Sequence, residues 1–232
     1  MEKIEQLRSK NDVHIYSIRD DQFRQYGRLI DSVDVSELVT YMEENTDIPA
    51  EGNIYVPSVR EMEETKAAHV ISTVMYGTMP IQIGYCNGRN STYNGFEYHK
   101  TNEIDIAVSD FMLAIGHCYD IGMDLTYSID QPDVFYVEKG TVFEMDGTTL
   151  HLSPLRVSDE GFRCVVILPK GTNTPLSDEE KRIRDMTYQG GDSEARLLLQ
   201  KNKWVISHPQ REPLMKQGAF PGVIGPNKEL FY

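Results

Sequence analysis

Two glutamates and a histidine lie close together in the middle of the chain, within residues 97–103 (EYHKTNE). Side chains alternate along an extended strand, so Glu97 and His99 would share one face. Glu103 can return to the same cavity on the next strand, and His151 can complete the set. Two imidazole nitrogens with two carboxylate oxygens suit a divalent transition metal better than calcium or magnesium. The predicted ligands are Glu97, His99, Glu103 and His151.

The residues before His151 strengthen this prediction. Gly140, Asp146, Thr148 and His151 have the spacing of the second cupin motif, G-x5-P-x-G-x2-H, with Asp146 in the proline position. Residues 97–103 are similar to the first motif, H-x-H-x3/4-E-x6-G, with Glu97 replacing the first histidine. Over roughly residues 76–169 the chain therefore resembles the cupin superfamily. This resemblance implies a small double-sheet β-barrel that holds one metal in its mouth.

A second resemblance lies near the N-terminus. Phe23, Tyr26, Gly27 and Ile30 are similar to the F-x-x-Y-G-x-v-I opening of ureidoglycolate lyases, which are themselves cupin-like. Residues 150–155 (LHLSPL) are also similar to the H-x-P-L metal region of that family. This resemblance implies lyase chemistry on a small hydroxy or ureido acid.

Composition narrows the class of partner. The 232 residues suit one domain, and 36 acidic against 23 basic residues give a net charge of -13. Nucleic acid and anionic membrane surfaces both need a basic face, so a small molecule is the expected partner.

No apolar run approaches the ~20 residues of a membrane span, and the start lacks the apolar core of a signal peptide. Three widely spaced cysteines without a C-x-x-C pair suit reduced thiols, so we expect a cytoplasmic protein.

Short strands separated by turn residues dominate the middle of the chain, which is typical of a sandwich or barrel. The strands are expected at residues 13–18, 70–75, 81–85, 96–99, 104–108, 111–115, 134–137, 142–145 and 161–168. The predicted fold is mainly β, a cupin-like double-sheet β-barrel with flanking N- and C-terminal helices and an irregular C-terminal arm. Residues 1–69 would pack on the barrel, residues 70–170 would form it, and residues 171–232 would supply the last helices and the arm.

The flanking helices are indicated by capping residues. Asp34 can cap a helix over residues 35–44, and S-x-x-E capping boxes begin at Ser58 and Ser177. A further helix is expected over residues 193–202. Residues 204–232 contain four prolines and several large apolar residues, so we expect an arm without regular structure that covers its own barrel or a partner subunit. A homodimer is the expected assembly.

A four-ligand centre with open positions would do Lewis-acid chemistry. We expect an isomerase or epimerase acting on a sugar or sugar derivative, with Glu97 or Glu103 as catalytic base and manganese, zinc, iron or nickel as the metal. The alternatives are a ureidoglycolate-lyase-like lyase, an oxygenase, and a non-catalytic sugar-binding cupin. No nucleotide-binding or serine-hydrolase motif is present. The candidate substrate-binding cations are Lys100, Arg163 and Lys216.

Overall fold

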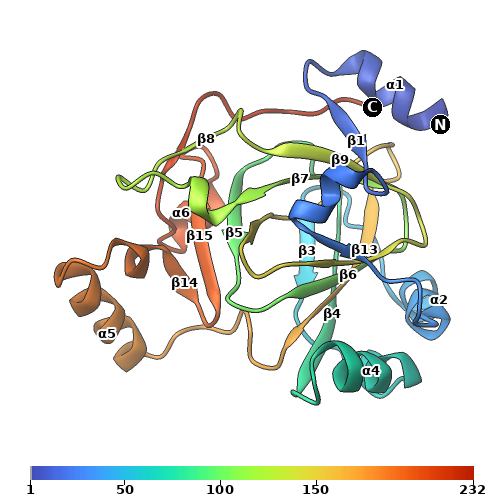
Figure 1. Cartoon of the computed structure of the whole chain (residues 1–232), viewed down its shortest axis with the longest axis horizontal. Coiled ribbons are helices and arrows are strands. Elements are labelled where there is room, and N and C mark those ends of the chain that lie inside the picture. The colour runs from blue at the N-terminus through green and yellow to red at the C-terminus, as the bar shows by residue number, and fades with distance from the viewer. Residues whose placement is uncertain (1) are drawn as a thin grey trace.

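The computed structural model describes residues 2–232, which form two facing β-sheets with helices outside them (Figure 1). The five-stranded sheet contains, in order, β1 (Ile15–Ser17), β9 (Asp133–Val137) and β7 (Phe111–His117), with β11 (Thr149–Leu150) and β12 (Leu155–Arg156) paired to β7. The six-stranded sheet has the order β2 (Gly27–Leu29), β10 (Val142–Met145), β6 (Glu103–Ala107), β13 (Phe162–Pro169), β4 (Ile81–Gly88) and β3 (Asn53–Val56). Within residues 2–232, no strand pairing joins the two sheets into a closed cylinder.

The space between the two sheets is filled by aromatic and aliphatic side chains. Phe111, Leu113 and Ile115 alternate along β7 and therefore point to the same face, where they meet side chains of β10 and β13. Phe23, in the short 3-10 helix η1 (Asp21–Gln25), packs against both sheets. Its ring centroid lies 5.6 Å from that of Phe135 and 5.9 Å from that of Phe143. The N-terminal segment thus contributes Phe23 to the apolar core between the two sheets.

Each sheet is covered on its outer face. The six-stranded sheet packs against α2 (Ser36–Asn45), α3 (Arg60–Glu63), α4 (Lys66–Val70) and the π-helical turn η2 (Ile71–Met75). The five-stranded sheet packs against α1 (Glu2–Lys10), the C-terminal arm and a three-stranded sheet of β14 (Leu198–Gln200), β15 (Lys203–Ser207) and β5 (Gly95–Tyr98). The remaining elements are η3 (Cys118–Asp120), β8 (Tyr127–Ser128), α5 (Asp178–Gln189), η4 (Ser193–Leu197), α6 (Glu212–Lys216) and β16 (Val223–Ile224).

The two ends of the described chain lie side by side (Figure 1). Asn11 exchanges hydrogen bonds of 2.8 Å with the backbone of Phe231, and Lys10 donates to the backbone of Tyr232. The arm also buries Val223 and Leu230 in the same apolar cluster as β7. It therefore covers its own sheets, which was one of the two expected positions.

The predicted fold class is confirmed: the protein is mainly β, with a cupin-like pair of sheets and helices at both ends of the chain. The capping box at Ser177 is also observed, because Ser177 and Glu180 exchange side-chain to backbone hydrogen bonds at the start of α5. Within residues 2–232, no helix is long and apolar enough to cross a bilayer.

Three local predictions were wrong. Residues 71–75 are rich in β-branched side chains but form a π-helical turn, because a helix capped by Thr65 continues into it and buries Ile71. Residues 198–200 form a strand instead of continuing a helix, and residues 203–207 of the arm form β15. The first proline of the arm is Pro209, so nothing prevents pairing of β15 with β5. In addition, β1, β2 and β3 come from before residue 70 and complete the two sheets.

Candidate metal centre

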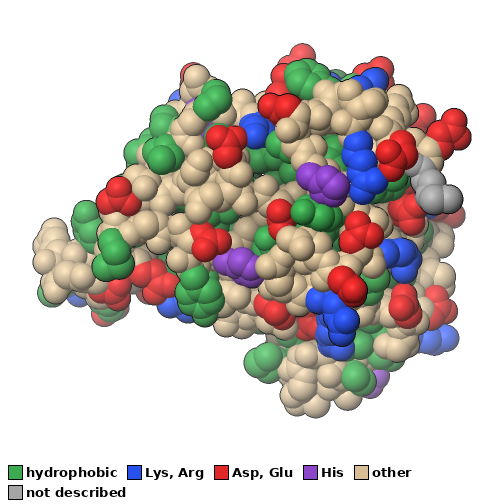
Figure 2. Space-filling view, turned by 45° about the horizontal axis from the view of Figure 1, so that its top comes forward, with side chains coloured by type: hydrophobic (Ala, Val, Ile, Leu, Met, Phe, Trp, Pro, Cys, Tyr) green, Lys and Arg blue, Asp and Glu red, His purple; other side chains and the backbone are tan. Residues whose placement is uncertain are grey.

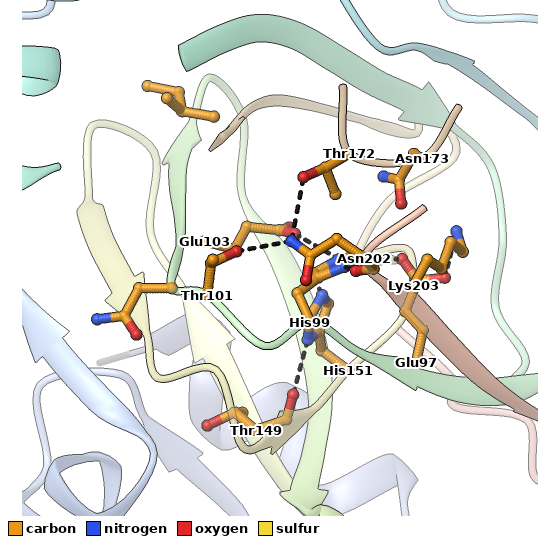
Figure 3. Close-up of polar contacts among 12 residues, drawn as sticks. Glu97, His99, Thr101, Glu103, Thr149, His151, Thr172, Asn173, Asn202 and Lys203 are labelled. Atoms are coloured by element: carbon orange, nitrogen blue, oxygen red, sulfur yellow. Dashed lines mark hydrogen bonds and ion pairs between the residues drawn. The ribbon is translucent and has the colours of Figure 1, made fainter. Parts of the chain in front are cut away.

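The four predicted ligands come from three places in the fold and lie close together (Figure 3). Glu97 lies on β5, His99 directly follows β5, Glu103 begins β6, and His151 directly follows β11. The backbones of Glu97 and His151 are paired by two hydrogen bonds, of 2.6 Å from Glu97 N and 2.9 Å from His151 N. This bridge holds the two distant segments of the sequence in register.

Glu103 lies between the two imidazole rings. Its Oε2 atom is 3.1 Å from His99 Nε2 and 3.3 Å from His151 Nε2. Glu97 is farther away, with its Oε1 atom 3.8 Å from His99 Nε2. Its Oε2 atom forms an ion pair with Lys203 Nζ at 2.5 Å. The two glutamates are therefore not equivalent, although all four ligand residues are buried.

Main-chain contacts fix the orientation of both rings. His99 Nδ1 lies 2.5 Å from the carbonyl oxygen of Asn202, and His151 Nδ1 lies 2.9 Å from that of Thr149. Since a carbonyl oxygen only accepts, each Nδ1 must carry a proton and donate it. In the neutral rings the lone pair is therefore on Nε2, which faces the other ligands. Such outer contacts are typical of histidines that bind metals.

The donor set fits a divalent transition metal. Ligand atoms of Glu97, His99 and His151 all lie within 4.8 Å of one another. Two ligands about 2.1 Å from one ion lie about 3.0–3.4 Å apart at octahedral or tetrahedral angles, which matches the spacing of Glu103 to both rings. The buried Nε2 atoms of both histidines also lack a hydrogen-bond partner of acceptable geometry within residues 2–232. Unpartnered buried nitrogens that converge on carboxylates are what a metal site requires.

Electrostatic coupling between these groups is strong. Burial raises the pKa of Glu103, but the facing His151 and His99 outweigh it and hold that pKa well below its ordinary value. Burial lowers the pKa of His151, while the Glu103 carboxylate more than reverses this and raises it to about 9. Burial next to Glu103 raises the pKa of Asp105 well above its usual range. A bound metal would replace the proton on His151, because a ligating imidazole must be neutral.

A cavity of about 380 Å³ opens beside the candidate centre. Glu97, Glu103, Asp105 and His151 line one part of it. The rest of the wall is mixed: apolar side chains such as Leu152, Val166 and Leu214 lie beside two cations, Lys203 and Arg211, and beside amide and hydroxyl side chains. These are Asn53, Tyr55, Ser153, Asn173, Gln200 and Gln217.

None of the three predicted substrate-binding cations lines this cavity. Lys100 pairs with Glu194 at 2.7 Å and lies over the Trp204 ring, because strand alternation turns it away from the face of His99. Arg163 donates to the carbonyl oxygen of Thr46 on the helix-covered side of the six-stranded sheet. Lys216 pairs with Glu212 on the exposed side of α6.

The cations that do line the cavity, Lys203 and Arg211, come from the C-terminal segments, and no motif in the sequence marks them. The sequence alone could have identified Asp105 as a residue of the cavity. It lies two residues after Glu103 on β6, so the alternation that places Glu97 and His99 on one face also places Asp105 in the cavity.

Fold and site together define a cupin-like protein with a candidate centre of two histidines and two glutamates beside a cavity that contains both apolar and polar side chains. The chain belongs to the family described as "Domain of unknown function (DUF4867)", whose profile matches residues 15–228. No curated protein matches the sequence.

Solved structures give distant matches. An oxalate decarboxylase of Bacillus subtilis with Mn(II) centres matches at 14% identity and a TM-score of 0.31, over 59% of this chain and 35% of that chain. Another structure of oxalate decarboxylase matches at 13% identity and a TM-score of 0.33, over 66% and 35%. DMSP lyases match at 13% identity and a TM-score of 0.27, over 40% of each chain. The chain thus spans about a third of the length of the oxalate decarboxylase chains.

Proposed function

We propose that this protein is a metal-dependent enzyme that isomerises or epimerises a small sugar derivative in the cavity beside the candidate metal centre. The observation that supports this most is the difference between the two glutamates. Glu103 lies between both imidazole rings, whereas Glu97 is displaced from them and held by Lys203. One carboxylate can therefore bind the metal while the other moves a proton.

In this proposal His99, His151 and Glu103 hold the ion, which is manganese, zinc, iron or nickel. When bound, the ion would polarise a carbonyl oxygen and so acidify the adjacent C–H bond. Glu97 is the fourth, looser ligand candidate. Since Lys203 anchors its Oε2 atom, its other oxygen keeps a fixed direction toward the ligand cluster and the cavity wall.

We assign Glu97 as the base that removes the proton and Tyr55 as the group that returns one. The Tyr55 hydroxyl accepts a hydrogen bond of 2.8 Å from Asn173 Nδ2, so its own proton is free to point into the cavity. Burial of that hydroxyl raises the pKa of Tyr55 far above its ordinary value, more than Asn173 lowers it. Tyr55 therefore stays protonated at neutral pH, and because it is a weak acid it gives up its proton only to a strongly basic carbanion.

The size of the cavity limits the substrate. At about 30 Å³ for each water-sized group, a volume of 380 Å³ has room for about a dozen such groups. This suits a monosaccharide derivative and supports a small-molecule substrate.

The test is solvent deuterium incorporation. The manganese-loaded protein is incubated in heavy water with aldoses, ketoses and sugar acids, and products are followed by proton NMR. We expect deuterium on the carbon next to the carbonyl group. Glu97→Gln should keep the metal and lose about 10²–10⁴-fold in rate, because general-base removal typically costs this much. Glu103→Gln should instead lose metal.

Other outcomes identify the alternatives. Consumption of dioxygen without deuterium incorporation would contradict the proposal and establish an oxygenase. Cleavage of a hydroxy or ureido acid would establish the lyase that the N-terminal resemblance implies. Sugar binding without turnover would establish a binding protein.

A further inference from the structure

We infer that the substrate carries an anionic group, a carboxylate or a phosphate, which binds Arg211 in the wall of the cavity. This inference rests on the proposed function, because it describes the substrate of the same site. It starts from the C-terminal segment, in which Lys216 was the residue expected to bind substrate. Arg211, Leu214 and Gln217 of this segment line the cavity.

The segment is held firmly in place. The backbone N–H of Arg211 donates to the carbonyl oxygen of His208 at 2.9 Å, and that of Met215 donates to the carbonyl oxygen of Arg211 at 3.1 Å. His208 is buried, and its Nε2 atom lies 2.9 Å from the carbonyl oxygen of Gly225. The backbone of Arg211 is thus positioned before any substrate arrives, so binding has to order only its side chain.

The guanidinium group of Arg211 is unpaired among the described residues. Within residues 2–232 it makes neither an ion pair nor a side-chain hydrogen bond, although the residue is half-buried. Its neighbour Glu212 is paired with Lys216 at 2.9 Å, and the other cavity cation, Lys203, is paired with Glu97. A partly desolvated charge without a counter-charge favours binding of an anion.

The charge balance of the cavity also favours an anionic substrate. Its three carboxylates belong to Glu97, Glu103 and Asp105. Even with all three ionised, a divalent ion together with Lys203 neutralises them, and the charge of Arg211 remains in excess. The molecule as a whole carries a net charge of -13, and acidic side chains are scattered over the face shown in Figure 2. A locally positive cavity in an acidic protein selects for an anion.

The geometry of the arginine side chain explains why a carboxylate or a phosphate is the expected anionic group. Its planar fork of N–H donors matches the oxygens of a carboxylate or a phosphate and can bind two of them at once. Gln217 lies on the same segment and lines the same cavity, so its amide can donate to a further oxygen. The remaining amide and hydroxyl side chains of the wall suit the hydroxyl groups of a sugar.

Binding to the manganese-loaded protein tests this inference, measured by isothermal titration calorimetry. The probes are three matched sets: glucose, glucuronate and glucose 6-phosphate, the corresponding galactose series, and the corresponding mannose series. We expect the anionic members to bind and their neutral counterparts to bind at least tenfold more weakly. The comparison of uronate with phosphate identifies which anion is preferred.

Variants test whether Arg211 is the residue that binds the anionic group. Arg211→Gln should weaken binding of the best anionic probe about 10- to 100-fold, the usual range for hydrogen bonds to a charged group. Arg211→Lys should recover part of this loss, because it keeps the charge but not the fork. Lys216→Gln is the matched control on the same segment and should bind as the wild type does.

Three results would overturn the inference: equal binding of neutral and anionic sugars, wild-type affinity in Arg211→Gln, or no binding of any anionic probe to the manganese-loaded protein. Metal content and deuterium incorporation, measured on the same samples, report on the proposed function alone. If the protein binds manganese and incorporates deuterium into a neutral sugar, the proposed function stands and the inference about Arg211 is wrong.

Discussion

The metal end of the cavity and its outer wall are stabilised in different ways. At the metal end, main-chain atoms fix the ligands: two backbone hydrogen bonds join Glu97 to His151, and carbonyl oxygens hold both imidazole rings. The outer wall depends on side chains from separate segments, above all Lys203 and Arg211. Substitutions of His99, Glu103 or His151 should therefore change metal affinity. Substitutions in the wall should change stability or substrate binding while metal is retained.

Lys203→Met should have the largest effect on stability. Lys203 and Glu97 are paired at 2.5 Å and their side chains are only 14% and 11% exposed, so the substitution leaves a buried carboxylate without its partner. Breaking such a pair typically costs about 3 kcal/mol, which we expect in the free energy of unfolding of the metal-free protein. With manganese bound the loss should be smaller, because the ion compensates the charge of Glu97.

Urea unfolding with EDTA and with excess manganese measures this difference. Lys201→Met is the matched control, since Lys201 pairs with Glu180 in an exposed position and should contribute about 0–1 kcal/mol. An equal loss for Lys203→Met with and without manganese would show that Glu97 does not face the ion.

Asn202→Ala should weaken metal binding about tenfold, the lower end of the range for residues that orient metal ligands. Asn202 has a positive φ of 53°, which asparagine tolerates better than alanine. Its side chain accepts from Lys100 N at 2.9 Å and donates to the hydroxyls of Thr101 and Thr172, while its carbonyl oxygen holds His99 (Figure 3). The substitution should release that ring.

Manganese titration against a competing chelator measures the affinity. Asn94→Ala provides the control, because Asn94 has a similar φ of 64° but lies before the other end of β5. If both variants bind manganese equally well, the backbone of Asn202 does not orient His99.

The smallest effect is expected for Lys100→Ala, although Lys100 directly follows His99 in the sequence. Its ion pair with Glu194 joins side chains that are 52% and 43% exposed, so it should stabilise the fold by about 0–1 kcal/mol. Metal content and binding of anionic sugars should match the wild type. A large loss of sugar affinity would place Lys100 in the substrate site after all.

These differences also explain what the sequence could predict. The ligands lie within residues 97–103 and at His151, so strand periodicity and motif spacing bring them together without knowledge of the whole fold. Most central strands were predicted for the same reason, because their alternation directly reflects one buried face.

The outer wall could not be predicted in this way. Tyr55 comes from β3, far in the sequence from Lys203 and Arg211 in the C-terminal segments, and only tertiary packing places the three in one cavity. Residues 71–75 and 198–200 show the same limit, since packing against a neighbouring sheet outweighed their local preferences. Dimer formation and ureidoglycolate-lyase similarity stay predictions.

Pulsed electron paramagnetic resonance on the manganese-loaded protein tests the central claim most directly, because it detects nitrogen nuclei bound to the ion. We predict coupling to two imidazole nitrogens in the wild type and to one in His151→Ala. His99→Ala combined with His151→Ala should abolish both the coupling and stoichiometric metal in elemental analysis. Full metal occupancy in that double variant, or a wild-type spectrum without nitrogen coupling, would contradict the assignment of this centre.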